Sequence, residues 1–279
     1  MLEPVIWYLS WCRRSKTKQQ TSASDQHEGY LVVCELAARY DSVFKVFKRN
    51  RHYRTVLEHL TGLQGLEYLK VVKEEDADLV NYYSAFQEND LLGSPHTFDY
   101  DVGRLSPTTL RYVKVLADLK SAFGDLGGLD ICEIGAGYGG QCKIISDVFD
   151  IASYTVIDLP RVLPLIQKYL NRCGVSNIIY LTPHQIREPL PFDLVLSNYA
   201  FAECTRQMQN FYLEKIIDKA RRGYLTYNFP RDFRTTAETS PYGKQEITER
   251  LSKMHSVRVL EEKPRTSPMN FLLIWKDLM

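Results

Sequence analysis

Residues 129–140 read Leu-Asp-Ile-Cys-Glu-Ile-Gly-Ala-Gly-Tyr-Gly-Gly, a short apolar run that ends in a glycine-rich turn. The apolar run predicts a strand over 129–134. The glycines would let a ligand approach the backbone where the next helix, predicted over 139–149, begins. The spacing of Gly135, Gly137 and Gly140 also fits the GxGxxG pattern of dinucleotide-binding proteins. The stretch therefore predicts a cofactor loop at the end of a strand and leaves the cofactor open.

Strands and helices alternate from this loop to the end of the chain. This alternation predicts crossover connections and parallel strands. The last two strands are joined only by residues 263–269, too few for a crossover helix, so the final strand should be antiparallel. Besides 129–134, strands are predicted over 154–157, 177–181, 192–197, 224–229, 256–262 and 270–276; helices are predicted over 161–173, 206–222 (ended by Gly223) and 244–254. The predicted fold class is α/β, with a doubly wound, mostly parallel seven-stranded sheet and an antiparallel last strand.

The first part of the chain has a different pattern. Over 30–83 the apolar residues recur every three or four positions, which predicts amphipathic helices after a polar linker over 15–28. Ser106 and Pro107 are typical of a helix start and open a further helix. We therefore predict two domains: a helical N-terminal region, 1–105, which covers the acceptor, and a cofactor-binding domain, 106–279.

Composition narrows the classes of partner. The 279 residues include 35 Lys and Arg against 34 Asp and Glu, and a net charge of +1 does not favour a nucleic-acid partner. The six cysteines form no CxxC pair, which suits a reducing compartment. The apolar run over 4–12 is too short to span a membrane, and basic residues follow it, unlike a secretory signal. We expect a cytoplasmic protein without a transmembrane segment. The oligomeric state stays open.

The acidic residue before the loop bears on which cofactor binds. A carboxylate at Glu133 would repel a pyrophosphate, whereas S-adenosylmethionine (SAM) carries a sulfonium and an ammonium group that a carboxylate attracts. Gln141 and Cys142 follow Gly140 in place of the Lys-Ser/Thr pair of nucleotide-triphosphate loops. SAM is therefore the predicted cofactor, and an NAD-dependent dehydrogenase is the alternative.

Asp158 ends the second predicted strand, where a carboxylate can accept the ribose hydroxyls of an adenosine cofactor. Its alternative role is to cap the helix near Arg161. The fourth strand ends near Asn198, at the same edge of the sheet. The predicted cofactor-binding residues are Glu133, Gly135, Ala136, Gly137, Asp158 and Asn198.

Residues 197–203, Ser-Asn-Tyr-Ala-Phe-Ala-Glu, should face the transferred methyl group. The stretch resembles the Asn-Pro-Pro-Tyr/Phe loop of amine methyltransferases but lacks both prolines, which disfavours an amino acceptor. A hydroxyl acceptor needs a base or a metal. Glu203 is the first candidate base and His184 the second. The alternatives are a first-turn helix acid for Glu203 and an exposed loop residue for His184. No metal ligands are predicted, although Mg²⁺ is kept as a candidate.

Four stretches carry a family resemblance: the loop 133–140, the run Gly-Arg-Leu-Ser-Pro-Thr-Thr-Leu-Arg-Tyr over 103–112, Leu-Glu-His over 57–59 together with 65–69, and 197–203. Over about 44–275 the chain resembles the sugar O-methyltransferase family of the class I SAM-dependent methyltransferases. The resemblance implies a hydroxyl of a sugar or glycoside as acceptor, hence a small-molecule or glycan partner. It also implies that Tyr100, Arg104 and Asn270 line the acceptor site. A non-catalytic methyltransferase-like binding module is the remaining alternative.

Overall fold

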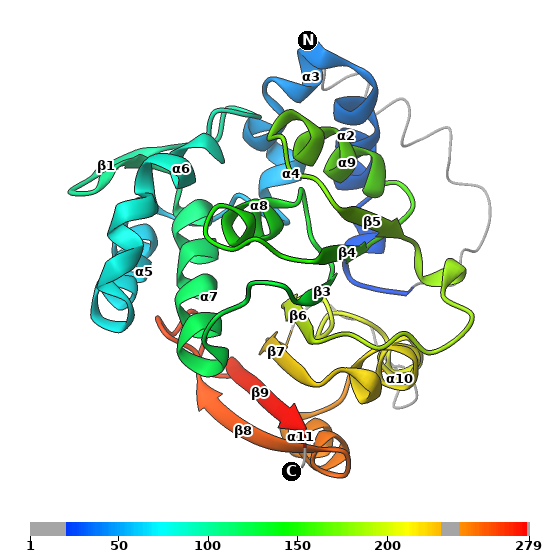
Figure 1. The fold of residues 1–279 in the computed structure, drawn as a ribbon. Helices are drawn as coiled ribbons and strands as arrows, with labels where there is room; N and C mark the ends of the chain where they lie inside the picture. Colours follow the sequence, from blue (N-terminus) through cyan, green and yellow to red (C-terminus); the bar gives the residue numbers. More distant parts are fainter. Residues whose placement is uncertain (1–20, 230–239, 278–279) are drawn as a thin grey trace.

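The computed structural model describes residues 21–229 and 240–277, which fold around a seven-stranded sheet (Figure 1). The apolar run over 4–12 and the first part of the predicted linker lie outside the described residues. The strand order is β5-β4-β3-β6-β7-β9-β8. The strands are β3 (Asp130–Ile134), β4 (Ser153–Ile157), β5 (Ile178–Leu181), β6 (Leu194–Asn198), β7 (Arg222–Tyr227), β8 (His255–Glu261) and β9 (Phe271–Asp277).

The pairing of the strands follows the predicted pattern. Strands β3 to β7 run parallel to one another, while β9 lies between β7 and β8 and is antiparallel to both. The short connection between β8 and β9 leaves no room for a crossover helix, so the chain must reverse. The predicted fold class is therefore confirmed.

Helices cover both faces of the sheet, and each face has its own hydrophobic cluster. The helix α7 begins as the sequence predicts, because the Ser106 hydroxyl accepts a hydrogen bond from the Thr109 amide at 3.1 Å and Pro107 occupies the first turn. The helices of this half of the chain are α7 (Pro107–Phe123), α8 (Gly140–Ser146), α9 (Leu163–Arg172), α10 (Arg206–Lys215) and α11 (Lys244–Ser252).

The largest difference from the predicted boundaries lies at the end of one helix. The helix predicted over 206–222 ends at Lys215 and is followed by a 3-10 turn, Ile217–Lys219. Gly223 does not end a helix but lies inside β7, opposite Trp275 of β9. A Cβ at Gly223 would lie 1.9 Å from the Trp275 ring, so this glycine is there to admit the indole.

The N-terminal region is helical, as predicted, and shares a core with the sheet half. One hydrophobic cluster joins Val33 and Tyr53 of this region to Tyr138 and Leu165 beside the sheet. Arg161 also binds Glu28 and Glu35 of α2 at 2.8 and 2.6 Å. The elements are α2 (Glu28–Arg39), α3 (Asp41–Phe44), α4 (Arg51–Arg54), α5 (Gly62–Glu75), α6 (Tyr83–Glu88) and the hairpin β1 (Phe98–Tyr100) and β2 (Gly103–Leu105), with 3-10 turns at Ser24–Gln26, Phe47–Arg49 and Ala77–Tyr82.

Candidate functional site

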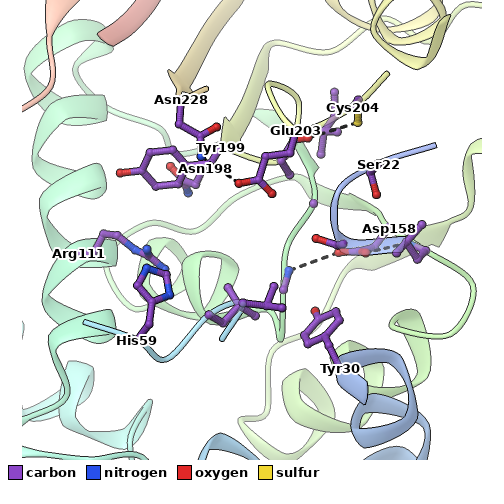
Figure 2. A pocket seen from close by; sticks show the side chains of 18 of the residues that line it. Ser22, Tyr30, His59, Arg111, Asp158, Asn198, Tyr199, Glu203, Cys204 and Asn228 are labelled. Carbon is purple, nitrogen blue, oxygen red and sulfur yellow. Dashed lines mark hydrogen bonds between the residues drawn. The ribbon is translucent and has the colours of Figure 1, made fainter. Parts of the chain in front are cut away.

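A cavity of 440 Å³ opens at the carboxyl ends of β3, β4 and β6 (Figure 2). Ligands of open α/β sheets bind at this edge, where neighbouring connections diverge. Loop residues of the sheet half form one part of the wall, and the N-terminal region forms the other. Lining residues used below are Leu57, His59, Tyr68, Arg111, Gly135, Gly137, Asp158, Asn198, Tyr199, Glu203, Asn228 and Asn270.

The glycine turn forms the floor of the cavity. Gly135 and Gly137 have φ values of +79° and +63°, in the region that favours glycine. A Cβ on Gly135 would lie 2.1 Å from the Cβ of Ala200, and one on Gly137 would lie 2.8 Å from the Leu57 side chain. Glycine therefore lets the turn fit between the β6 loop and the N-terminal region while still facing the cavity.

Asp158 follows β4 directly and lines the cavity. Its carboxylate accepts hydrogen bonds from the amides of Gly137, at 3.3 Å, and Leu159, at 2.7 Å. Desolvation outweighs these bonds and raises the pKa of Asp158 to about 7. The carboxylate keeps further lone pairs for a ligand, since each oxygen accepts one backbone bond.

Glu133, by contrast, does not line the cavity. It is 1% exposed and accepts a hydrogen bond from the Tyr154 hydroxyl at 2.8 Å. Burial raises its pKa to about 8, so the carboxyl is largely uncharged at neutral pH. Side chains alternate along a strand, so Glu133 lies on the same face of β3 as Ile131, whereas Ile134 of the opposite face lines the cavity. The electrostatic role predicted for Glu133 beside a cofactor is therefore not supported by its position. Ala136 does not line the cavity either.

Asn198, the last residue of β6, lines the cavity together with Tyr199 and Glu203 of the segment that follows. The Asn198 amide donates to the side chain of Gln141 at 3.3 Å, and Tyr199 has a φ of +68°, a strained value for an aromatic residue. Glu203 accepts a hydrogen bond from Asn228 at 2.9 Å, and desolvation raises its pKa above the ordinary value. Figure 2 shows the Glu203 carboxyl pointing into the cavity.

Of the other predicted site residues, only Asn270 lines the cavity. His184 is exposed and lies outside the lining. The Tyr100 hydroxyl donates to the carbonyl of Gly62 at 3.1 Å, and exposed Arg104 binds Thr97 at 2.9 Å. Both belong to the β1–β2 hairpin, which Figure 1 shows at one side of the molecule, so the structure does not bring these two residues to the cavity.

Several lining residues were not predicted. His59 and Arg111 lie side by side in Figure 2, and both belong to runs that carry the family resemblance, the one available signal. Desolvation and the charge of Arg111 lower the pKa of His59 to about 4, so its ring is neutral at pH 7.

Residues before α2 also reach the cavity, in part of the run predicted as a linker. Ser22 and Cys204 form an isolated antiparallel β-bridge, and the amide of Ala23 donates a hydrogen bond to the carbonyl of Glu203 at 2.9 Å. Thr21, Ser22 and Ser24 line the cavity. The polar composition of this segment does not predict that it packs against the cavity, because its hydrogen bonds are made to residues about 180 positions further along the chain.

Unpaired polar atoms gather in this wall. Twelve buried side-chain nitrogen or oxygen atoms of the described residues lack a hydrogen-bond partner, and four of them belong to lining residues: Tyr68 Oη, Arg111 Nε, Asn198 Oδ1 and Asn228 Oδ1. Buried polar groups without partners are uncommon in folded proteins. Residues of the cavity wall therefore carry polar atoms that the described chain does not pair.

No three His, Cys, Asp or Glu side chains of residues 21–229 and 240–277 are grouped so as to hold a metal ion. Within the same ranges, no helix has the length and apolar character needed to cross a membrane.

No protein-family model matches the chain, and no curated protein is similar to it in sequence. Solved structures are similar to it in fold. A SAM-dependent methyltransferase from Aquifex aeolicus has 16% identity and a TM-score of 0.42, with 76% of this chain and 98% of that one covered. The N-methyltransferase NodS from Bradyrhizobium japonicum WM9, in complex with S-adenosylhomocysteine, has 16% identity and a TM-score of 0.44 over 61% and 86% of the two chains. An rRNA methylase from Streptococcus thermophilus has 14% identity and a TM-score of 0.40 over 56% and 89%.

Proposed function

We propose that this chain is a SAM-dependent O-methyltransferase that acts on a hydroxyl of a sugar or glycoside. The observation that carries the proposal is the cavity itself, which joins the glycine turn and Asp158 to a wall of unpaired polar groups. The methyl donor would bind at the glycine turn and Asp158, and a hydroxyl-rich acceptor would bind at the polar wall.

The residues present fit the donor. Asp158 can accept the two ribose hydroxyls, because its carboxylate lies at the edge of the sheet with lone pairs to spare. The turn at Gly135 and Gly137 keeps side chains away from the cavity floor. Bound SAM would supply an electrophilic methyl group, and the chain would mainly align the acceptor with it.

Glu203 is the candidate base. Methylation of a hydroxyl requires removal of its proton, and a carboxyl with a raised pKa is a better proton acceptor than an ordinary one when ionised. Asn228 holds the side chain in place at 2.9 Å. Neutral His59, across the cavity, is a second candidate that can accept a hydrogen bond from the acceptor. His184 is exposed and lies outside the cavity lining, which disfavours it as the base.

The remaining wall suits a carbohydrate. Neutral hydrogen-bonding groups and aromatic rings suit an acceptor with many hydroxyl groups and apolar ring faces. Together with the family resemblance of the sequence, this supports the sugar acceptor. The lining residues of this kind are Gln64, Tyr68, Asn228, Phe229, Thr266, Ser267 and Asn270.

Calorimetry with S-adenosylhomocysteine tests the donor site. We expect binding to the full chain and a loss of about 10- to 100-fold in Asp158→Ala, because a charged hydrogen-bond acceptor to the ribose is removed. Asp99→Ala, which removes an exposed carboxylate from β1, is the matched control and should bind normally. A protein that binds NAD but not S-adenosylhomocysteine would be a dehydrogenase.

The acceptor requires a second experiment. Labelled SAM incubated with fractionated glycans from the source cell, with and without Mg²⁺, should transfer label to a carbohydrate fraction. Donor binding without turnover over a broad acceptor panel would instead indicate a non-catalytic module.

A further inference from the structure

Arg111 is an unusual member of the cavity wall. It lies in the first half of α7 and is 8% exposed, yet it lines the cavity beside His59 (Figure 2). Removing a guanidinium from water is costly unless an anion or several hydrogen-bond acceptors replace the water. We therefore consider which counter-ions and hydrogen-bond acceptors the described residues provide for this guanidinium.

Among the described residues, no carboxylate forms an ion pair with Arg111, and its Nε has no hydrogen-bond partner. The guanidinium lies 5.7 Å from the ring centre of Tyr112 and 5.9 Å from that of Tyr199. Lys114, one turn further along the same helix and 4% exposed, is bound to Asp118 at 2.6 Å. The chain thus pairs one buried cation of α7 with a carboxylate, and the other lies in the cavity wall without an ion pair.

Three acids in the surroundings of Arg111 are bound to other groups. Glu58 accepts from the Thr108 hydroxyl at 2.9 Å, and burial raises its pKa, which favours its uncharged form. Glu203 is bound by Asn228, and Glu262 accepts from Thr266 and Asn270 at 2.5 and 3.0 Å. None of the three forms an ion pair with Arg111, which leaves the guanidinium without a direct counter-ion.

We propose that Arg111 is an anion subsite that binds a carboxylate of a ligand held in this cavity. The inference rests on the proposed function and adds to it the residue that would bind a carboxylate of the ligand. Two ligands would bring this group: the donor, through the carboxylate of its methionine part, or an acidic acceptor such as a uronic acid. Figure 2 shows Arg111 and Asp158 on opposite sides of the cavity, so one ligand that spans it would contact both.

The test compares S-adenosylhomocysteine with 5′-methylthioadenosine, which keeps the adenosine and lacks the amino acid part. If the donor supplies the carboxylate, the wild-type chain should prefer S-adenosylhomocysteine. Arg111→Gln should then lose about 10- to 100-fold of that affinity while 5′-methylthioadenosine binding changes less than about twofold. Arg111→Lys, which keeps the charge but not the paired geometry, should lie between. Arg172→Gln, which changes an exposed arginine at the end of α9 outside the cavity, is the control.

If the acceptor supplies the carboxylate, S-adenosylhomocysteine should bind Arg111→Gln normally. D-glucuronate should then bind the wild-type chain saturated with S-adenosylhomocysteine more tightly than D-glucose does, in ligand-observed NMR, and Arg111→Gln should abolish the preference. Equal losses for all ligands, or no change for any, would overturn the subsite while the donor site stands. A wild-type chain that binds neither adenosyl compound would end the proposed function, and the subsite with it.

Discussion

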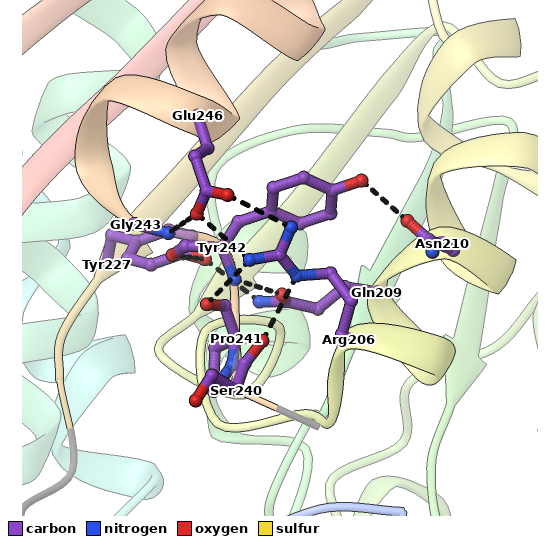
Figure 3. Close-up of polar contacts among 9 residues, drawn as sticks. All are labelled: Arg206, Gln209, Asn210, Tyr227, Ser240, Pro241, Tyr242, Gly243 and Glu246. Carbon is purple, nitrogen blue, oxygen red and sulfur yellow. Dashed lines mark hydrogen bonds and ion pairs between the residues drawn. The ribbon is translucent and has the colours of Figure 1, made fainter. Parts of the chain in front are cut away.

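Two arginines with the same chemistry lie in contrasting surroundings. Arg206, at the start of α10, is held on every side (Figure 3): it donates to the carbonyls of Ser240 and Pro241 at 3.1 and 3.2 Å, pairs with Glu246 at 2.9 Å and lies 3.7 Å from the ring centre of Tyr242. Arg111 is more deeply buried and has no ion pair among the described residues.

The difference separates a structural cluster from a binding site. Around Arg206 the network continues, because Gln209 accepts from the Tyr242 amide at 2.7 Å and donates to the Tyr227 hydroxyl at 2.9 Å. A network whose groups are all paired makes a rigid connection, here between α10, β7 and the start of α11. Around Arg111 the described residues provide no ion pair, and under our proposal a ligand would supply one. Substitutions in the first region should therefore change stability, and those in the second should change binding or catalysis.

The largest expected effect is the loss of methyl transfer on substitution of Glu203 in the cavity. Glu203→Gln keeps the size of the side chain and an oxygen for Asn228 but removes the base, so methyl transfer should fall about 100-fold or more. S-adenosylhomocysteine affinity and the midpoint of urea unfolding should stay near wild type. The measurement is transfer of label from SAM at saturating donor. Equal rates in the two proteins would exclude Glu203 as the base.

Arg206→Met should have the opposite profile. It removes charged hydrogen bonds from a side chain that is 24% exposed and should lower the free energy of unfolding by about 2–3 kcal/mol. Urea denaturation measures this loss, and calorimetry under folding conditions should give unchanged S-adenosylhomocysteine affinity. An altered affinity together with unchanged stability would contradict the distinction between the two regions.

The smallest expected effect is a pH dependence of donor binding. Because the pKa of Asp158 is about 7, its carboxylate is mostly ionised at pH 8 and mostly protonated at pH 6. If the ionised form binds the ribose, S-adenosylhomocysteine affinity should fall about tenfold from pH 8 to pH 6. Asp158→Asn cannot titrate and should give a flatter profile in the same calorimetric series. A profile equally steep in that variant would assign the titration to another group, such as Glu133 or Glu203.

Much of the fold was predictable from local sequence. The alternation of strands and helices and the short connection between β8 and β9 were sufficient for the sheet and its reversed last strand. Gly223 was predicted to end a helix, but it lies in β7. A glycine after a helical pattern can end the helix, and it can equally leave room in a strand for a large ring on the neighbouring strand. The facing residue, Trp275, lies far along the chain.

The candidate site was predictable only in part. Gly135, Gly137, Asp158, Asn198 and Glu203 follow strand ends of one parallel sheet, and the carboxyl ends of parallel strands meet at one edge. Arg111 and His59 lie within recognised runs, but nothing in their spacing indicates that they meet. Tyr100 and Arg104 show the opposite case. The family resemblance implies that they line the acceptor site, but the β1–β2 hairpin places them outside the cavity lining.

The sequence by itself determined the order of the elements, the glycine turn and the acidic residue at the end of β4, because each depends on residues within a few positions of one another. Only the tertiary structure decided which charges face the cavity. Strand alternation and packing direct Glu133 toward Tyr154, while α7 presents Arg111 beside a segment of the N-terminal region. Burial and neighbouring charges, which determine ionisation, are properties of segments brought together by folding and are not encoded in any one of them.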